Sequence, residues 1–432
     1  MALSDIRIGR TNCNFEREPL VAPFGFKGRY LTELWQTVAL LESESGAVGL
    51  GLGTQSPLWS DGRVFAENSE AASNSLMYLL TAHALKLAEG VSFETPMELL
   101  DKLLPEVHEH GCRVTGNPDL RLTFTLNSLV ALDNAAWQLY CASNGITGFD
   151  EMLPGDVRPA LSGRQSQLGC IPLMTYGVKL PDIVREAENG HFLLKIKIGS
   201  DPDRDGDPEK MLEWDIERIT SIHTELKDLT TPHTDSGHIL YYLDANGRYD
   251  TKERLMWLLD AAEKSGALDR IVLLEEPFAE DCEIDVRGMG VRVAADESAH
   301  SDADALKRIQ MGYTAIALKP IAKTMSMSLR IAKLAAERNV PCFCADLTVN
   351  PILVEWNKNV AARLAPLPGV KIGVVESNGP QNYRNWDDML SYHPALGAPW
   401  IEPVEGVFHL DEDFYERSGC ILEASEHYRV LV

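Results

Sequence analysis

The sequence predicts an α/β protein, a (β/α)8-type TIM barrel with an α+β capping domain built from N-terminal and C-terminal segments. Two observations predict this fold. Beyond about residue 165, eight short β-rich runs alternate with helical segments, which is typical of parallel strands joined by helices. Before that point, β-rich runs come first and helical runs follow, which indicates a separate α+β unit. A doubly wound open sheet is the alternative arrangement of the eight strands.

Length and charge narrow the class of protein. The chain has 432 residues, more than one ordinary domain holds, and 45% of them are hydrophobic, which supports a large core. It contains 64 Asp and Glu residues against 40 Lys and Arg, a formal net charge of −24. Because nucleic acids and anionic membranes bind cationic surfaces, this charge argues against both as partners.

The chain is expected to be a soluble, cytoplasmic protein. The stretch "MALSDIRIGR" at its start lacks the pattern of a secretory signal, and no apolar run approaches the roughly 18 to 20 residues that span a bilayer. The eight cysteines are scattered without the density of a disulfide framework, so we interpret them as reduced thiols.

The N-terminal part is predicted to form strands over 4–15, 30–43 and 46–54, with residues 16–30 as a long loop because they hold two Pro and two Gly. Helices are expected next. Their predicted ranges are 69–90, 93–111 and 120–145, each of which ends at a Gly.

The eight strands of the barrel follow in order. They are expected within "GCIPLMTYGV", "HFLLKIKIGS", "ILYYLDANG", "RIVLLEEPF", "VRVAADES", "YTAIALKPI", "VPCFCADL" and "VKIGVVES". Residues 200–235 are longer than a minimal connection and predict an added helix and a polar loop. The expected domain boundaries are 1–160 for the N-terminal cap, 161–390 for the barrel and 391–432 for a segment that returns to the cap.

Two lysines in the second strand need an explanation. Side chains alternate between the two faces of a strand, so Lys195 and Lys197 share one face, and Leu194, Ile196 and Ile198 share the other. Burying an unpaired charge costs several kcal/mol as an order of magnitude, so buried lysines require partners of opposite charge.

Carboxylates at the following strand ends supply such partners. Active-site groups of a parallel barrel come from the C-terminal ends of its strands. The third, fourth and fifth strands end in Asp244, Glu275 and Asp296, each separated from the next by about one strand–helix unit. Neighbouring strand ends would therefore hold three oxygen ligands side by side. With no His or Cys among them, Mg2+ is the cation that fits best.

This arrangement favours proton abstraction next to a carboxylate. A lysine that is desolvated near a cation has a lowered pKa and can act as a general base. Lys197 is the candidate base, with Lys195 as its electrostatic neighbour, and Lys319 ends the sixth strand. Mg2+ would stabilise the enediolate formed when the proton leaves.

These motifs resemble the enolase superfamily, specifically its mandelate racemase and muconate-lactonizing branch, over nearly the whole chain. "LDANGRYD", "EEP" and "ADES" look like the three metal-ligand strands of the family. "LKIKIG" looks like its second-strand Lys-x-Lys, whose second lysine is the acid/base. The resemblance implies that Asp244, Glu275 and Asp296 bind Mg2+, that Lys197 moves a proton, and that the protein is a homo-oligomer.

"IALKP" resembles the sixth-strand lysine of the muconate-lactonizing subgroup, which implies a catalytic role for Lys319. That subgroup carries a double glycine after the lysine, whereas this chain continues "IAKTMSMS", so Lys323 is an alternative for the same role. No His-Asp dyad of the mandelate racemase type is evident, and we interpret His300 as a loop histidine.

Substrate contacts are expected from the cap and from the remaining strand ends. The loop 17–30 should fold over the barrel mouth, with Phe24 and Phe26 as an apolar wall and Lys27 or Arg29 meeting a distal carboxylate. "SPLWSDG", 56–62, resembles the second cap loop of the family. The other substrate-binding candidates are Thr175 in the first strand candidate, Asp346 after the seventh strand and Glu376 in the eighth.

The prediction is a Mg2+-dependent enzyme that removes the proton α to a substrate carboxylate. A lysine on each face of the substrate implies a racemase or epimerase, with a dipeptide or an N-acylamino acid as the best guess for the substrate. The alternatives are elimination, as in acid-sugar dehydration or o-succinylbenzoate synthesis, and cycloisomerisation. A non-catalytic, metal-binding relative is a hypothesis of a different class.

Overall fold

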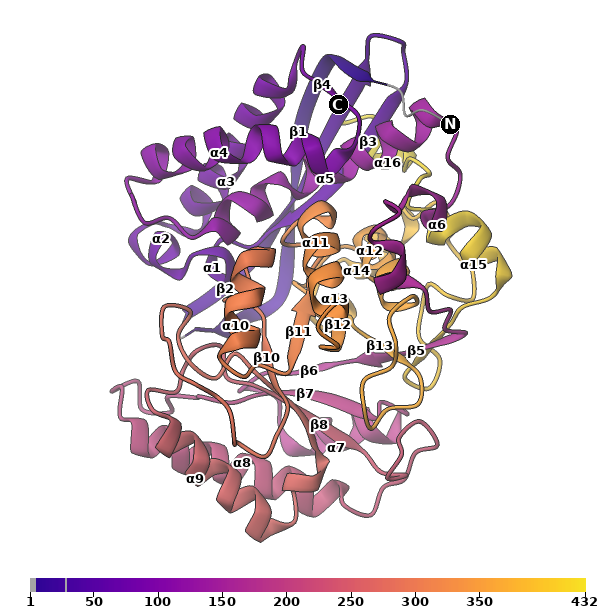
Figure 1. Cartoon of the computed structure of the whole chain (residues 1–432). Coiled ribbons are helices and arrows are strands. Elements are labelled where there is room, and N and C mark those ends of the chain that lie inside the picture. Colours follow the sequence, from indigo (N-terminus) through magenta and orange to yellow (C-terminus); the bar gives the residue numbers. More distant parts are fainter. Residues whose placement is uncertain (1–4, 28) are drawn as a thin grey trace.

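The computed structural model describes residues 5–27 and 29–432 and contains a cap above a barrel (Figure 1). The cap sheet is antiparallel, in the order β3-β2-β1-β4. Its strands are β1 (Ile6–Phe26), β2 (Arg29–Ser43), β3 (Val48–Gln55) and β4 (Ser92–Phe93). Side-chain caps fix helix starts in this part, as at Ser69 and Thr95. The cap helices are α1 (Pro57–Ser60), α2 (Gly62–Glu67), α3 (Glu70–Ala88), α4 (Pro96–Thr115), α5 (Leu122–Asn144) and α6 (Phe149–Met152).

The predicted loop over residues 16–30 is wrong. β1 continues to Phe26 and pairs with β2, so most of this segment is one long hairpin, with a register shift between Pro19 and Phe24. Proline cannot donate to a strand ladder, but an irregularity in the pairing accommodates it. The Pro and Gly residues that suggested a loop therefore mark a bulged strand.

Glycines set the distance between β3 and α5. A Cβ atom at Gly49 or Gly51 would lie 2.0 Å from the carbonyl oxygen of Ala135 or Ala131, so only glycine lets the helix backbone contact the strand directly. The stripe "GLGLG" therefore serves packing in the cap.

The predicted barrel is present, and the open-sheet alternative is wrong. β5 (Gln167–Ile171) and β6 (Leu173–Met174) are two parts of one strand interrupted by Pro172. β5 pairs with β13 and β6 pairs with β7, both in parallel, so the sheet closes on itself. The other strands are β7 (Leu193–Lys197), β8 (Leu240–Asp244), β9 (Ile271–Glu275), β10 (Val293–Ala295), β11 (Ala315–Leu318), β12 (Cys342–Cys344) and β13 (Gly373–Glu376).

Helices follow the strands around the barrel. The long ones are α7 (Leu180–Glu188), α8 (Pro208–Leu226), α9 (Lys252–Ser265), α10 (Asp302–Gln310), α11 (Met325–Ala336) and α12 (Pro351–Ala361). Between β7 and β8 the described chain holds one helix, α8, flanked by polar loops, so the longer connection adds loop and no second helix. Short elements complete this part: η1 (Arg158–Leu161), η2 (Leu268–Arg270), α13 (Gly379–Asn382) and α14 (Trp386–Ser391). No described helix is long and apolar enough to cross a membrane.

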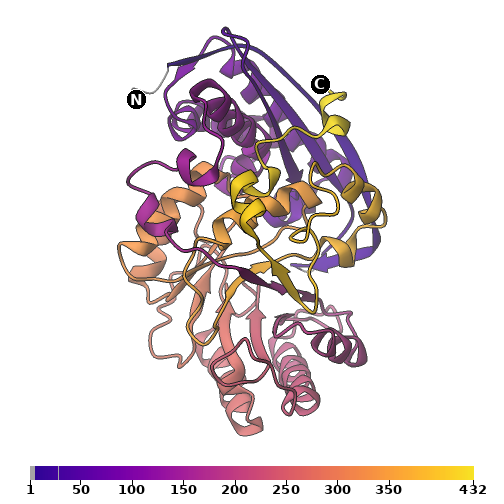
Figure 2. The same ribbon diagram turned by 90° about the vertical axis from the view of Figure 1, so that its right-hand side faces the viewer.

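The C-terminal segment touches both the barrel and the cap (Figure 2). Its strand β14 (Val407–His409) pairs antiparallel with β5. Further along, His427 Nε2 lies 2.9 Å from a carboxylate oxygen of Glu16 in β1. The helices of this segment are α15 (Glu412–Arg417), η3 (Ser418–Cys420) and α16 (Glu426–Arg429). The boundaries at residues 160 and 390 stay a prediction.

Candidate active site

Strand register brings the predicted site residues together. Lys197 at the end of β7 is in register with Asp244 at the end of β8, and Asp244 is in register with Glu275 at the end of β9. All three side chains are buried inside the barrel mouth. Parallel pairing therefore sets one lysine and two carboxylates side by side, because the ends of parallel strands meet at one rim.

Lys195 is held by three carboxylates. Its Nζ lies 3.0 Å from Asp244, 3.2 Å from Glu275 and 3.1 Å from Glu376. Burial on its own lowers the pKa of Lys195, but these three charges outweigh it and raise the pKa well above the ordinary value. Lys195 therefore stays positively charged in this site. Its buried charge is tolerated because three carboxylates compensate it.

Lys197 has a different set of contacts. Its Nζ donates to Asp244 Oδ2 at 2.5 Å and to Asn246 Oδ1 at 2.6 Å, and it lies 5.9 Å from the ring centre of Phe26. Burial raises the pKa of Asp244, but Lys195 and Lys197 lower it more, to about 2. Lys197 thus faces the cavity from the rim, with one carboxylate and one amide as partners.

Lys319 lies on the other side of the same cavity, on the segment that follows β11. Its Nζ is 2.5 Å from Asp296 Oδ2 and 4.6 Å from the ring centre of Trp59 in the cap. Lys323, the alternative, is fully buried and donates to the carbonyl oxygen of Asp296 at 2.5 Å. The cavity lining includes Lys319 and leaves out Lys323.

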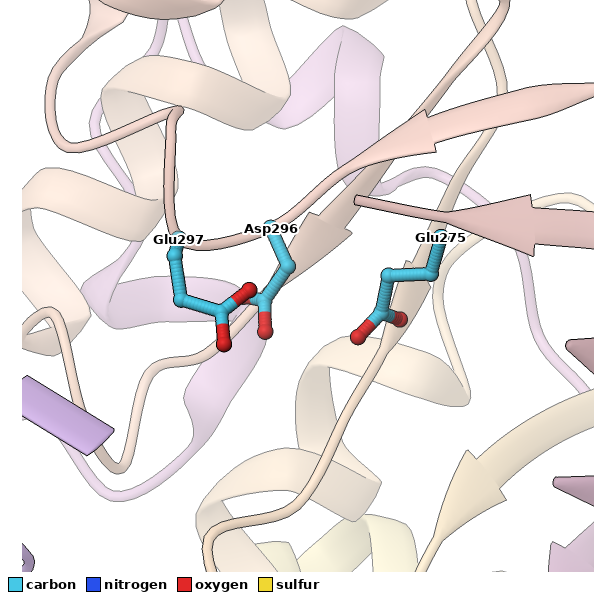
Figure 3. A group of neighbouring side chains, drawn as sticks. All are labelled: Glu275, Asp296 and Glu297. Carbon is cyan, nitrogen blue, oxygen red and sulfur yellow. The ribbon is translucent and has the colours of Figure 1, made fainter. Parts of the chain in front are cut away.

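Three carboxylates form a possible cation site (Figure 3). Glu275, Asp296 and Glu297 each offer an oxygen within 4.8 Å of the others, and all three are buried. One oxygen of each, Glu275 Oε2, Asp296 Oδ1 and Glu297 Oε2, is buried without a hydrogen-bond partner. Burial raises the pKa of Glu275 to about 7, whereas Lys319 and Lys323 hold the pKa of Asp296 well below its usual range despite burial. Buried oxygens of this kind fit a hard divalent cation.

The structure divides the predicted metal ligands. Glu275 and Asp296 belong to the cluster, whereas Asp244 lies outside it, because Oδ2 of Asp244 is taken by both lysines and Oδ1 accepts from the backbone N–H of Asn246. Glu297 takes the third place in the cluster. Strand alternation would place Glu297 on the face opposite Asp296, but β10 ends at Ala295, so alternation no longer applies to it.

Sequence analysis also missed Asn246. Its amide links the two halves of the site, since its Oδ1 accepts from Lys197 and its Nδ2 donates to Glu297 Oε1 at 3.0 Å. Its position two residues after Asp244 in "LDANG" was the available signal.

The cap hairpin closes the mouth. Phe24 and Phe26 line the cavity and contact each other edge to face, with ring centres 5.6 Å apart. The cavity beneath it is only about 40 Å³. Lys27 is not part of its lining; its Nζ donates to the carbonyl of Trp59 at 3.1 Å and lies 3.3 Å from Glu297 and 3.6 Å from Glu280. Lys27 therefore fastens the hairpin tip to the acidic side of the barrel.

The remaining candidates differ in position. Asp346 and Glu376 line the cavity, and the backbone N–H of Asp346 donates to Glu376 Oε2 at 3.0 Å. Burial and Glu376 raise the pKa of Asp346 to about 7. Thr175 lies outside the lining, and its carbonyl accepts from Arg218. His300 is also outside it and pairs with Glu280.

Comparisons with known proteins agree with this architecture. Residues 180–391 match the family model of enolase C-terminal domain-like proteins. No curated protein matches the chain. A dipeptide epimerase of Enterococcus faecalis V583, solved with Mg and the dipeptide L-Leu-L-Tyr, has a TM-score of 0.65 at 17% identity, covering 94% of this chain and 98% of that one.

Two further solved structures share the fold. A mandelate racemase/muconate lactonizing enzyme of a Roseiflexus species gives a TM-score of 0.64 at 18% identity, covering 96% and 98% of the two chains. The L-Ala-D/L-Glu epimerase of Bacillus subtilis gives 0.60 at 18% identity, covering 88% and 91%.

Residues 180–391 thus match the C-terminal domain of the enolase superfamily, and the chain shares the fold of these solved structures. The fold of the whole chain is the one that the resemblance of its motifs to the mandelate racemase/muconate lactonizing branch implies. Members of the superfamily are racemases, epimerases and lyases.

Proposed function

We propose that the protein is a Mg2+-dependent racemase or epimerase that acts on the carbon next to the carboxylate of a dipeptide or an N-acylamino acid. One observation carries the proposal: Lys197 and Lys319 line one cavity from β7 and from the end of β11. These are the second and sixth strands of the ring of eight, so the two ammonium groups stand on opposite sides of the barrel. Inversion at a carbon needs this placement, because one group removes a proton and the other returns one to the opposite face.

The carboxylates between the two lysines would hold the metal. We assign Glu275 and Asp296 as ligands and keep Asp244 as the proposed third. When bound, Mg2+ supplies positive charge that stabilises the substrate carboxylate as it gains negative charge.

Lys197 and Lys319 share the proton transfer, one as the base and the other as the acid. The neutral form of one lysine takes the α-proton onto its Nζ, the substrate becomes an enediolate, and the ammonium of the other lysine gives its proton to the other face of the carbon. Lys195 stays charged beside the substrate carboxylate throughout. Phe24, Phe26 and Trp59 exclude water above the reacting carbon.

The ligands bound to two structurally similar proteins support the choice of substrate. The Enterococcus faecalis protein and a dipeptide epimerase of Cytophaga hutchinsonii were both solved with Mg and a dipeptide. In this chain, the carboxylates of Asp346 and Glu376 line the cavity and suit a substrate ammonium or amide group.

Isotope exchange tests the proposal. The Mg2+-loaded protein is incubated in D2O with pooled dipeptides, N-acylamino acids and sugar acids, and product masses are read. We expect a gain of one mass unit without loss of water. If no pooled compound exchanged, the proposed substrate class would be excluded. Exchange of both enantiomers in Lys197→Ala would contradict the mechanism.

Elimination is the second candidate function, and Asp346 favours it. With its pKa raised to about 7, this carboxyl holds a proton over part of the neutral range at the cavity wall and could protonate a leaving hydroxyl. Loss of water from a sugar acid in the same experiment would identify this activity.

A further inference from the structure

The turn that carries Lys319 runs directly into the start of α11. Residues 319–326 connect the end of β11 to the first turn of this helix, and all of them are buried. The carbonyl of Lys319 accepts from the backbone N–H groups of Ala322 and Lys323, at 2.9 and 2.8 Å. Thr324 follows with a φ of 69°, which a β-branched residue rarely adopts. Such a conformation persists only where surrounding contacts hold it, so the turn depends on its neighbours.

Asp133 of the cap helix α5 supplies contacts of this kind. The residue is 2% exposed. Its Oδ2 accepts from the backbone N–H of Ser326 at 3.0 Å, and its Oδ1 accepts from the hydroxyl of Ser326 at 2.5 Å. Trp137, one turn further along α5, donates from Nε1 to the same hydroxyl at 3.1 Å. The first N–H groups of a helix lack partners within the helix, so a buried carboxylate there ties α5 firmly to the start of α11 (Figure 1).

The same cap helix holds the ring on the other side of Lys319. Oδ1 of Asn127, also in α5, accepts from the backbone N–H of Ser56 at 3.0 Å and from the hydroxyl of Ser60 at 3.2 Å. Trp59 lies between these two serines, and its ring centre is 4.6 Å from Nζ of Lys319. One helix therefore fixes both the turn that carries Lys319 and the ring that lies against it.

Lys197 is positioned by other parts of the molecule. Its backbone is paired in register with Asp244 on β8, and its Nζ donates to Asp244 and Asn246. Its contact with the cap is the ring of Phe26 on the hairpin. The barrel strands therefore position Lys197, whereas α5 of the cap positions the segment of Lys319.

We infer that Asp133 is a positioning residue for the Lys319 side of the reaction, because it fixes the start of α11 and with it the ammonium group of Lys319. The inference rests on the proposed function, in which Lys319 serves one face of the substrate. A displacement of about 1 Å at a reacting group can cost about 100-fold in rate. Loss of the Asp133 contacts should therefore slow proton transfer at one face of the substrate and leave the face served by Lys197 nearly unchanged.

Exchange of each pure enantiomer in D2O tests the inference. Lys319→Ala first identifies the enantiomer whose α-proton Lys319 removes. Asp133→Leu removes both acceptor oxygens at nearly equal size. We expect it to slow exchange of that enantiomer by about 10-fold to 100-fold and exchange of the other by less than about 2-fold. Equal slowing of both enantiomers, or of neither, would overturn the inference.

A conservative variant and a matched control accompany this measurement. Asp133→Asn should recover part of the loss, because its amide oxygen can still accept from the backbone N–H of Ser326. The control is Gln138→Leu on the same helix. Gln138 accepts from the backbone N–H of Leu50 at 2.9 Å and donates to the carbonyl of Ile421 at 2.8 Å, so its loss weakens α5 away from Lys319. The same enantiomer selectivity in Gln138→Leu would contradict the assignment to Asp133.

A second measurement requires no substrate. Hydrogen exchange of the backbone amides over residues 319–327 is followed by mass spectrometry in the wild type and in both leucine variants. We expect faster amide exchange of this segment in Asp133→Leu alone. Unchanged amide exchange would overturn the inference even if the enzyme racemises its substrate. A wild type that exchanges no α-proton would instead refute the proposed function, and the amide measurement would then decide whether Asp133 fixes this segment.

Discussion

Two lysines on one face of β7 have different roles because their neighbours differ. Lys195 lies within 3.2 Å of three carboxylates, which hold it as a cation. Lys197 contacts one carboxylate and the amide oxygen of Asn246. Its Nζ also lies over the ring of Phe26, which belongs to the cap. We therefore expect Lys195 to fix positive charge and Lys197 to move a proton.

Single lysine variants should separate the two faces of the reaction. Lys197→Ala and Lys319→Ala are each expected to slow racemisation by about 1,000-fold, within the usual range for a general acid or base. Each variant should still exchange the α-proton of the one enantiomer that faces its remaining lysine. NMR in D2O with each pure enantiomer measures this.

Lys210→Ala is the control for these variants, because Lys210 is exposed and pairs only with Asp203 and Asp205. Equal loss of exchange for both enantiomers in both variants would refute the two-base mechanism.

Metal affinity should depend on the cluster carboxylates. Glu275→Gln and Asp296→Asn are expected to weaken Mg2+ binding by more than about 10-fold, since groups that merely support a ligand already have effects of that size. Titration calorimetry measures the affinity. Glu376→Gln is the matched control, because Glu376 is equally buried and contacts Lys195 but lies outside the cluster.

One further pair of variants decides whether Asp244 or Glu297 is the third Mg2+ ligand. The assignment of Asp244 requires Asp244→Asn to weaken Mg2+ binding more than Glu297→Gln does. The reverse order would transfer the role to Glu297, whose Oε2 lacks a hydrogen-bond partner.

Sequence reasoning located residues at strand ends better than residues on turns. Asp244, Glu275 and Lys197 follow from strand alternation and from the rule that parallel strands end at one rim. The role of Glu297 and the ion pairs of Lys27 were not predicted, because each residue lies just beyond a strand, where backbone turns rather than alternation set the side-chain direction.

At the scale of elements, α8 is tied to the active-site strand by a buried acid. Both carboxylate oxygens of Asp215 accept from the backbone N–H of Gly199, at 2.9 and 2.8 Å, and Oδ2 also accepts from the hydroxyl of Tyr249 at 2.7 Å. Gly199 follows β7 by two residues, so this contact fixes the loop that leaves Lys197.

The Asp215 contact predicts a pH-dependent stability. Burial raises the pKa of Asp215 from 3.8 to about 7, so the folded state retains a proton that the unfolded chain loses. Between these values the unfolding free energy falls as pH rises, by at most about 1.4 kcal/mol per pH unit. Relative to Asp215→Asn, the wild type should therefore lose stability from pH 5 to pH 8 in urea denaturation.

The exposed Asp228, on the loop after α8, provides the control. Asp228→Asn should follow the wild type across the same range. A constant difference between wild type and Asp215→Asn would show that the acid titrates normally.

For the whole molecule, the sequence predicts the barrel, the cap and their order, because strand–helix alternation is a long-range repeat that survives local irregularity. The hairpin over 16–30 escaped prediction, since Pro19 and Pro23 mask a strand whose pairing is set by β2 rather than by its own residues. The sequence did predict that this segment covers the mouth. The ion pairs of Lys27 escaped prediction, because its partners come from two distant barrel loops.

The closure of the mouth depends on Lys27. Lys27 connects the hairpin to Trp59 of the cap and to Glu280 and Glu297 of the barrel, all on the rim of the active site. Each of its ion pairs is largely buried, so its loss should favour an open mouth without unfolding the barrel. Lys27→Met should raise KM about 10-fold or more, the effect of losing one hydrogen bond to a charged group, and should speed proteolysis of the hairpin.

The control lies on the same hairpin. Arg17 pairs with Glu33 across β1 and β2, away from the barrel, so Arg17→Met should leave KM and proteolysis unchanged. The urea midpoint of Lys27→Met should also stay near that of the wild type, since the barrel core does not include this residue. If Lys27→Met lowered the midpoint as much as it raised KM, the residue would support the fold as a whole, and the hairpin would not act as a separate lid.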